Sequence, residues 1–172
     1  MSRVAPAPRV RPPFSALLST GSVARVARAS TDLHELASGR LRGLDQRYTR
    51  GRRALIEVLA RADAPLSIPQ LLAADSSLAQ SSAYRNLAEL ERAGVVHRIV
   101  TSDEFARYEL AEDLTEHHHH LICSNCGDVR DFTVPSTLED ELDRALDRIA
   151  GQHGFAVDHH RLDLVGTCSS CA

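Results

Sequence analysis

Four cysteines form two Cys-x-x-Cys pairs, Cys123 with Cys126 and Cys168 with Cys171, and the chain has no other cysteine. Two thiols separated by two residues can reach one ion from a tight turn, and four thiolates complete the tetrahedron that zinc prefers. Four protein ligands leave no open position for water, so this pattern predicts a structural Zn(II) site. The alternative is a pair of disulfides, which suits exported chains. The sequence carries no convincing export signal.

A run of four histidines, His117 to His120, leads directly into apolar residues. The apolar residues favour a strand. Successive side chains of a strand point to opposite faces, so His117 and His119 are expected on one face and His118 and His120 on the other. One strand can therefore supply two imidazoles to each of two metal sites.

Two residues further along the chain can complete the first site, with His117 and His119. Glu139 lies near the start of a predicted helix whose inner side holds Leu138, Leu142, Ala145 and Ile149, and His160 lies in a predicted strand from 158 to 165. Each has an alternative interpretation. Ser136 to Glu139 has the form of a capping box, which engages the carboxylate without metal, and a lone histidine such as His160 is commonly an ordinary half-buried residue.

The second site, with His118 and His120, can be completed by His97 and Glu109. Such a site would join two parts of the chain, and metal binding would fix their relative orientation, as in a switch. His97 can instead lie near a phosphate, and Glu109 can be a solvated strand residue. Three acidic residues nearby compete for the same role: Glu112, Asp113 and Glu116.

Apolar spacing between residues 48 and 111 predicts three short helices followed by a β-hairpin. The first helix ends at Asp63-Ala64-Pro65, and the second opens with the capping box Ser67-Ile68-Pro69-Gln70. The third starts behind Ser81 or Ser82 as its cap and ends at Gly94. Strands are expected at 95–100 and 107–110, with a turn at Ser102-Asp103 between them.

Helix, turn, helix and hairpin is a DNA-reading arrangement in which the third helix enters the major groove. Its first turns carry short donors, an aromatic ring and a guanidinium, which suit phosphates and base edges. An arginine cluster upstream can hold the DNA backbone. Alternatively, the arginines form a solvated face and the tyrosine packs internally. The candidate DNA-binding residues are Arg47, Arg50, Arg52, Arg53, Gln80, Ser81, Ser82, Tyr84 and Arg85.

The charge of the 172-residue chain is divided unevenly although its formal net charge is only −3. Residues 1–53 hold 11 arginines and 3 acids, residues 54–110 hold 5 and 8, and residues 111–172 hold 4 and 12. An arginine-rich start joined to an acidic end indicates a polyanion-binding half and a half with another task.

Residues 1–31 contain five arginines, four prolines and no acid, which predicts a flexible extension before the folded chain. A transit peptide or additional DNA contact would also suit this composition. No run approaches 18 apolar residues, so a membrane-spanning protein is not expected.

Taken together, these motifs resemble the ferric uptake regulator (Fur) family of bacterial metal-dependent repressors. The resemblance spans about residues 33–172. It lies in the arginine cluster, the third helix, Gly94-Val95-Val96, the histidine run, both cysteine pairs and His153-Gly154-Phe155. It implies an α/β (α+β) homodimer with a winged helix-turn-helix DNA-binding domain at 32–111, a hinge at 112–116 and a metal-binding α/β dimerisation domain at 117–172. By position, Tyr84 and Arg85 match the family's DNA-contacting pair.

The resemblance also assigns the two histidine sites. The family's dimerisation-domain site falls on His117, His119, Glu139 and His160, and its sensing site on Glu109, His118, His120 and a residue of the DNA-binding part. The chain departs from the family at that last ligand. Ala64-Pro65-Leu66 stands where many iron-type members have a histidine, so His97 is the expected fourth ligand. Zinc-type members often add a cysteine near position 111, where this chain has Ala111, and two extra residues separate Glu109 from His117.

The sequence therefore predicts a cytoplasmic, dimeric, metal-responsive repressor that binds an inverted-repeat operator in double-stranded DNA, with no membrane partner and no small-molecule substrate. Its sensing site of nitrogen and oxygen ligands suits Fe(II) or Zn(II), with Ni(II) and Mn(II) also compatible. One alternative is a zinc-ribbon interaction module without DNA binding. Another is a zinc hydrolase or deaminase, which would need an open zinc position and a general base that the sequence does not supply.

Overall fold

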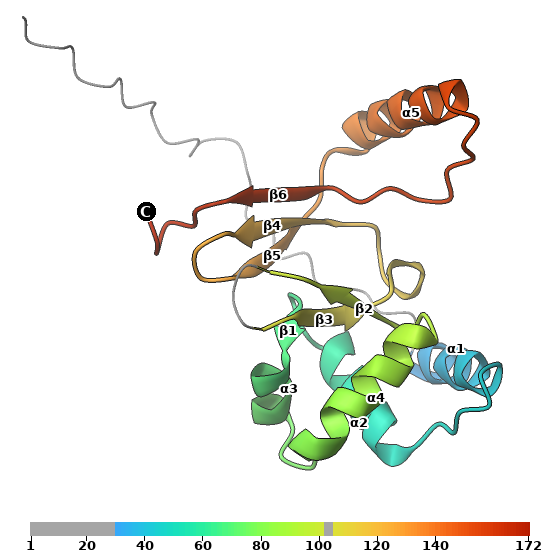
Figure 1. Cartoon of the computed structure of the whole chain (residues 1–172), viewed down its shortest axis with the longest axis vertical. Coiled ribbons are helices and arrows are strands. Elements are labelled where there is room, and N and C mark those ends of the chain that lie inside the picture. Colours follow the sequence, from blue (N-terminus) through green and yellow to red (C-terminus); the bar gives the residue numbers. More distant parts are fainter. Residues whose placement is uncertain (1–29, 102–104) are drawn as a thin grey trace, which may run out of the picture.

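The amino-terminal half is a helical layer packed on a small antiparallel sheet (Figure 1). The structure, a computed structural model, describes residues 30–101 and 105–172. The elements of this half are α1 (Ser30–Arg42), α2 (Arg50–Ala60), β1 (Leu66–Ser67), α3 (Ile68–Ala74), α4 (Gln80–Arg92), β2 (Val96–Ile99) and β3 (Arg107–Leu110). The strand order is β1-β3-β2. The predicted order of helices and hairpin is confirmed; the predicted turn at Ser102-Asp103 and most of the extension lie outside the described residues.

The ends of α3 and α4 show which local signals position the helix-turn-helix. Ser67 caps α3, and the reciprocal Ser67 and Gln70 bonds of the predicted capping box are both present. The cap predicted for α4 was wrong. That helix begins at Gln80 behind Ala79, with no side-chain cap, and the Ser82 hydroxyl donates to the Ala79 carbonyl at 3.0 Å. Gly94 follows α4 with φ +65°, a conformation that favours glycine.

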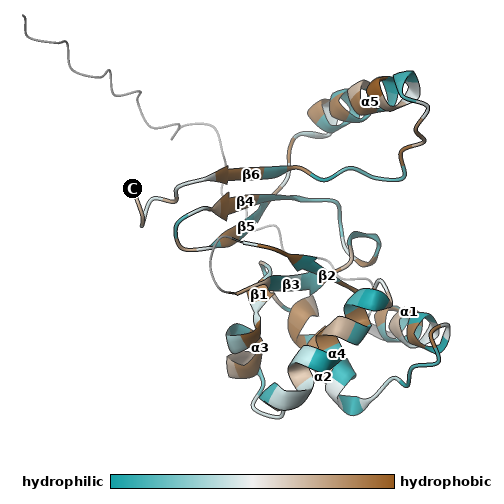
Figure 2. Ribbon diagram, viewed as in Figure 1, coloured by the Kyte–Doolittle hydropathy of each residue, from teal (hydrophilic) through white to brown (hydrophobic). Residues whose placement is uncertain are grey.

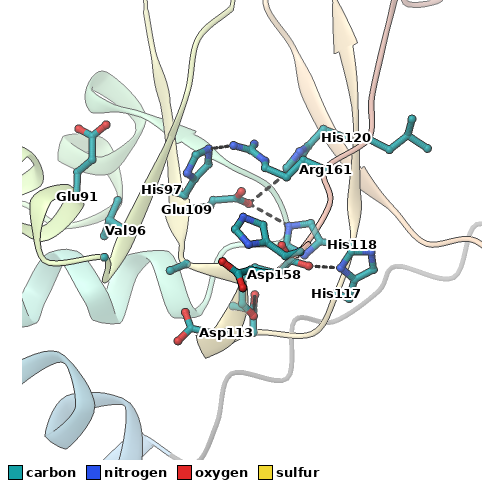
Figure 3. Close-up of a pocket in the computed structure, with 16 residues that line it drawn as sticks. Glu91, Val96, His97, Glu109, Asp113, His117, His118, His120, Asp158 and Arg161 are labelled. Atoms are coloured by element: carbon teal, nitrogen blue, oxygen red, sulfur yellow. Dashed lines mark hydrogen bonds and ion pairs between the residues drawn. The ribbon is translucent and has the colours of Figure 1, made fainter. Parts of the chain in front are cut away.

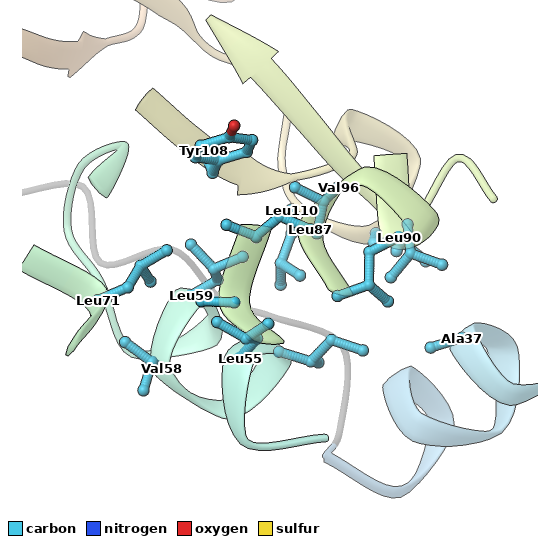
Figure 4. Close-up of a cluster of buried hydrophobic side chains, with 14 of the residues drawn as sticks. Ala37, Leu55, Val58, Leu59, Leu71, Leu87, Leu90, Val96, Tyr108 and Leu110 are labelled. Carbon is cyan, nitrogen blue, oxygen red and sulfur yellow. The ribbon is translucent and has the colours of Figure 1, made fainter. Parts of the chain in front are cut away.

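The core of this half is a continuous apolar cluster between the helices and the sheet (Figure 4). Leu55 and Leu59 of α2 and Leu87 of α4 are fully buried in it. Helix α1, which the sequence analysis did not anticipate, adds Leu33, Ala37 and Leu41, spaced by four residues on one helical face. Helix α4 is therefore held by packing against α1 and α2.

The segment predicted as a hinge, 112–116, is partly built into this half. Residues Glu112–Leu114 form the short 3-10 turn η1. Leu114 is completely buried in the apolar cluster, and the Ala111 amide donates to the Val95 carbonyl at 3.0 Å. The chain is thus fixed to the amino-terminal half as far as Leu114.

The carboxyl-terminal half is a three-stranded sheet with one long helix. Its elements are β4 (His119–Cys123), β5 (Val129–Phe132), α5 (Ser136–Gln152) and β6 (Asp163–Gly166), in the strand order β5-β4-β6. Strand β4 is central, antiparallel to β5 and parallel to β6. Strand β4 begins at His119, two residues later than predicted. His160 lies before β6 and not, as predicted, within the strand. Ile122 and Val129 pack with Ile99 at the end of β2, and this contact joins the two halves.

Helix α5 has no buried residue, so the described residues of the chain do not bury its predicted inner side. Leu138 and Ile149 are 50% and 54% exposed, and Leu164 and Val165 of β6 are also exposed. Figure 2 shows these apolar stretches on α5 and β6 at the surface of the carboxyl-terminal half. Among the described residues, no helix is long and apolar enough to cross a membrane.

Truncating a core side chain should destabilise the amino-terminal half far more than truncating an exposed one. Leu59→Ala should lower the free energy of unfolding by about 2–5 kcal/mol, because it removes buried contacts and leaves a cavity. The matched control is Val100→Ala, at a position 73% exposed, where a change within about 0.5 kcal/mol is expected. Urea denaturation at one protein concentration measures both; equal effects would contradict this packing.

Candidate metal centres and nucleic-acid surface

The four cysteines converge at one end of the carboxyl-terminal sheet. Cys123 and Cys126 lie at the β4–β5 turn, and Cys168 and Cys171 follow β6. No disulfide joins them, and their four sulfurs lie within 4.8 Å of one another. The Cys126 and Cys168 sulfurs are 3.8 Å apart, which is the edge of a tetrahedron with metal–sulfur bonds of about 2.3 Å. The donor set fits Zn(II), as predicted, and leaves no ligand position open.

Hydrogen bonds set unequal acidities within this group. Backbone N–H groups of Cys126, Cys168 and Asn125 lower the pKa of the Cys123 thiol to about 6. Hydrogen bonding with Cys168 and Cys126 raises the pKa of the Cys171 thiol to about 12. The two thiols are thus unequal as acids, and a cation bound by all four sulfurs would displace the remaining protons.

A second group lies between β4 and α5. It contains all four residues predicted for the dimerisation-domain site: His117, His119, Glu139 and His160. The Glu139 carboxylate lies 3.1, 3.0 and 3.0 Å from the Nε2 atoms of the three histidines. Burial raises the pKa of Glu139, but the His119 hydrogen bond and the neighbouring imidazoles outweigh it and lower that pKa. The capping-box alternative is wrong, because α5 has no side-chain cap and Glu139 faces the histidines.

A third group lies between the two halves of the chain. It joins Glu109 of β3, His118, His120 of β4 and Asp131 of β5. Glu109 is 4% exposed, and its Oε2 lies 3.1 Å from His118 Nε2 and 3.3 Å from His120 Nε2. The Asp131 carboxylate lies 3.9 and 3.8 Å from the same two nitrogens. Three of the four predicted sensing residues are therefore brought together, and Asp131, which the sequence analysis missed, takes the fourth place.

His97 is close to the third group but outside it. It pairs across the β-hairpin with Glu109, and its Nε2 contacts the Arg161 guanidinium (Figure 3). Burial, followed by the Arg161 charge, lowers the pKa of His97, so its lone pair is directed at a hydrogen-bond donor. Both residues line a pocket of about 680 Å³ between the halves, together with Glu109, His118 and His120. His97, predicted as a ligand, is therefore not one of the four residues that the structure brings together, and its Nε2 contacts Arg161 instead.

The outer ring nitrogens explain how the histidines are aimed. His118 Nδ1 donates to the Glu116 carbonyl at 2.8 Å, which leaves its Nε2 lone pair for the group. His120 Nδ1 lies 3.1 Å from Asp163, and His160 Nδ1 lies 2.9 Å from Asp143. A carboxylate or carbonyl behind a ligating imidazole is typical of metal sites. Within the described chain, these outer partners are a further indication that both groups are built for a cation.

The predicted DNA-binding residues fall into an exposed set and a buried one. Ser81, Tyr84 and Arg85 are exposed at the start of α4, with Tyr84 54% exposed, and Arg47 and Arg50 are exposed before and at the start of α2. Ser82 is half-buried. Arg52 is only 6% exposed and donates to the Arg47 carbonyl at 2.6 Å and to Gln46 at 3.0 Å. Arg52 is thus a correction: its donors hold the segment before α2 and do not face outward.

Comparison with known proteins identifies the family to which a chain with these three groups and this helix-turn-helix belongs. The model of the ferric uptake regulator family matches residues 44–165. The chain is also 30% identical to the peroxide operon regulator of Bacillus subtilis over 145 residues, 81% of this chain and 94% of that protein. This chain belongs to the ferric uptake regulator family. Proteins of the Fur family are metal-responsive DNA-binding regulators, so the alternatives of a zinc hydrolase and of a module without DNA binding are set aside.

Solved Fur-family structures agree with the fold. The Helicobacter pylori ferric uptake regulator, described as having three functional metal binding sites, superposes with a TM-score of 0.66 at 23% identity, over 84% of this chain and 95% of that one. A zinc-bound manganese uptake regulator superposes with a TM-score of 0.54 at 32% identity, over 79% of this chain and 98% of that one. The division into a winged helix and a dimerisation domain is thereby confirmed.

Asp131 and His97 should differ in their effect on the interdomain group. Asp131→Ala removes a member of the group, and we expect at least the 10- to 100-fold loss of Mn(II) affinity that altering even an outer partner causes. His97→Ala should leave that affinity within about threefold, because the side chain is outside the set. Asp128→Ala, a carboxylate just before β5 and outside the group, is the control. Equal losses in the Asp131 and His97 variants would contradict the assignment.

The cysteine site should hold the end of the chain against β4. In Cys171→Ser, zinc content should fall by about one equivalent per chain, and amide exchange of β4 should accelerate, because β6 loses its anchor. Ser170→Ala, the exposed neighbour, should keep both zinc and protection. Metal analysis and hydrogen-exchange mass spectrometry measure the two effects; full protection of β4 without zinc would speak against a clamp.

Proposed function

We propose that this Fur-family chain acts as a metal-dependent repressor whose sensing site is the interdomain group. One observation carries the proposal: Glu109, on a strand of the DNA-binding half, lies between His118 and His120 of the other half. A cation held there would contact both halves and so favour one relative orientation. To move the population from mostly inactive to mostly active, the metal must prefer that orientation by about 5 kcal/mol.

The repressor acts as a homodimer in this proposal. The exposed apolar residues of α5 and β6 supply the surface, because soluble chains rarely leave such a set uncovered. Two recognition helices related by a twofold axis require an inverted-repeat operator, with half-sites about one helical turn apart or a small multiple of it. Such a regulator works where the chromosome is, so we place it in the cytoplasm.

Three metal sites have different roles in this proposal. The cysteine group holds structural Zn(II), and the interdomain group holds the regulatory divalent metal. Fe(II) and Zn(II) are the first candidates for the regulatory metal, with Mn(II) and Ni(II) also compatible with nitrogen and oxygen ligands. The group of His117, His119, Glu139 and His160 supports the fold of the dimerisation domain and is available to the same ions.

Metal should control operator binding through His118. With wild-type protein, Mn(II), Fe(II) or Zn(II) should shift an operator of the family type, and a chelator should abolish the shift. His118→Ala should lose most of the metal response, whereas His153→Ala, an exposed histidine outside both histidine groups, should retain it. Mobility shifts that are the same with chelator and with metal would overturn the proposal.

The DNA surface has its own control in the same assay. Arg85→Ala should weaken metal-loaded binding by about 1–3 kcal/mol, and the affinity of the wild type should fall as salt rises, because phosphate contacts release counterions. Arg92→Ala, at the far end of α4 and paired with Glu89, should bind as the wild type does. Salt-independent binding would favour an interaction without phosphate contacts.

A further inference from the structure

The 3-10 turn η1 is fixed to the DNA-binding half by more than the burial of Leu114. Asp113 forms an ion pair with Arg40 of α1, and the Arg40 guanidinium also donates to the carbonyl of Gly94. Gly94 is the residue at which the chain leaves the recognition helix α4. Any movement of η1 therefore changes a contact at the end of α4.

The same turn also reaches the dimerisation-domain group. The Glu112 carboxylate contacts Nδ1 of His117, while Nε2 of that ring lies 3.1 Å from Glu139 inside the group. The two ring nitrogens point in different directions, so Glu112 lies behind the imidazole and not among the ligand atoms. A carboxylate in this position fixes the tautomer and orientation of a ligating histidine and raises its basicity.

The origin of this outer partner distinguishes it from the corresponding one on His160. Asp143, behind His160, belongs to α5 and therefore to the same half as the ligands. Glu112 belongs to a turn that is packed on the other half. The four ligand atoms of the group all come from the carboxyl-terminal half, yet one of their orienting contacts crosses to the DNA-binding half.

We propose that Glu112 is a positioning residue that couples cation binding at His117, His119, Glu139 and His160 to the DNA-binding half. His117 would hold a cation through Nε2, and this would strengthen the hydrogen bond from its Nδ1 to Glu112 and so keep η1 in place. Through Asp113 and Arg40, the held turn preserves the contact at the end of α4. The inference rests on the proposed function and adds a second point at which metal sets the domain orientation.

The test separates metal affinity from coupling. The parent is the full-length His118→Ala chain, which retains zinc in its cysteine site and is cleared of weaker metals, so that the interdomain group is disabled. Mn(II) is titrated and free Mn(II) is measured by electron paramagnetic resonance. Amide exchange of residues 111–116 is then compared without Mn(II) and at saturation. The variants added to the parent are Glu112→Ala, Glu116→Ala and Asp143→Asn.

Glu112→Ala should weaken Mn(II) binding by about 10- to 100-fold, and saturation should no longer slow exchange at 111–116. Asp143→Asn should also weaken Mn(II) binding. At saturation, however, Mn(II) should still slow exchange at residues 111–116 in this variant, because Asp143 lies on α5 and not on η1. Glu116→Ala, an exposed acid of the same segment, should behave as the parent. These results would show that Glu112 links cation binding to the DNA-binding half. An acid with only a structural role would not affect exchange in this way.

Either of two results in the Glu112→Ala variant would overturn the inference while the proposed function stands: unchanged Mn(II) affinity, or slowed exchange at saturation. A parent that binds Mn(II) without any effect on residues 111–116 would have the same consequence. If the parent binds no Mn(II), the assignment of this group as a metal site fails together with the inference. The failure of the repressor proposal itself is read separately, from operator binding.

Discussion

The buried carboxylate of Glu109 is the constraint on which the arrangement of the two halves depends. It lies 4% exposed among imidazoles, and an ionised acid cannot remain out of water without a positive partner. The contacts of about 3 Å to His118 and His120 require either a proton or a metal between oxygen and nitrogen. Whether a proton or a metal lies between them, the strand that carries Glu109 is held close to β4. In the proposed function, the position of the β2–β3 hairpin therefore follows the state of this site.

Strand β4 converts one short sequence into two separate sites. Its alternation sends His119 to Glu139 and His120 to Glu109, so each site samples a different neighbour: α5 on one face and the DNA-binding half on the other. The parallel pairing with β6 places Gly166 beside Cys123. The cysteine group therefore lies at the end of the same three-stranded sheet. Zinc there would fix the register of β6 and with it the position of Asp163 behind His120.

The parts of the fold that follow local rules were predictable, and those that depend on tertiary contacts were not. The geometry of the Ser67 capping box, of the turn at Gly94 and of each Cys-x-x-Cys pair depends on only a few neighbouring residues. These features could therefore be predicted from the sequence. Asp131 could have been found only from the β4–β5 register, which pairs it with His120. Arg52 looked like its exposed neighbours because charge patterns do not show which arginine turns inward. Glu139 matched a capping box, but three imidazoles attract its carboxylate more than the backbone does.

The ligand types of the two histidine groups imply different preferences among divalent metals. Three imidazoles and one carboxylate in the group with Glu139 suit Zn(II), whereas two imidazoles and two carboxylates in the group with Glu109 are more permissive of Mn(II) and Fe(II). Neither contains a thiolate. Selectivity at the interdomain group must therefore come from geometry and from competition for its acids. Arg161 lines the same pocket and contacts His97. Its positive charge would repel a dication bound nearby.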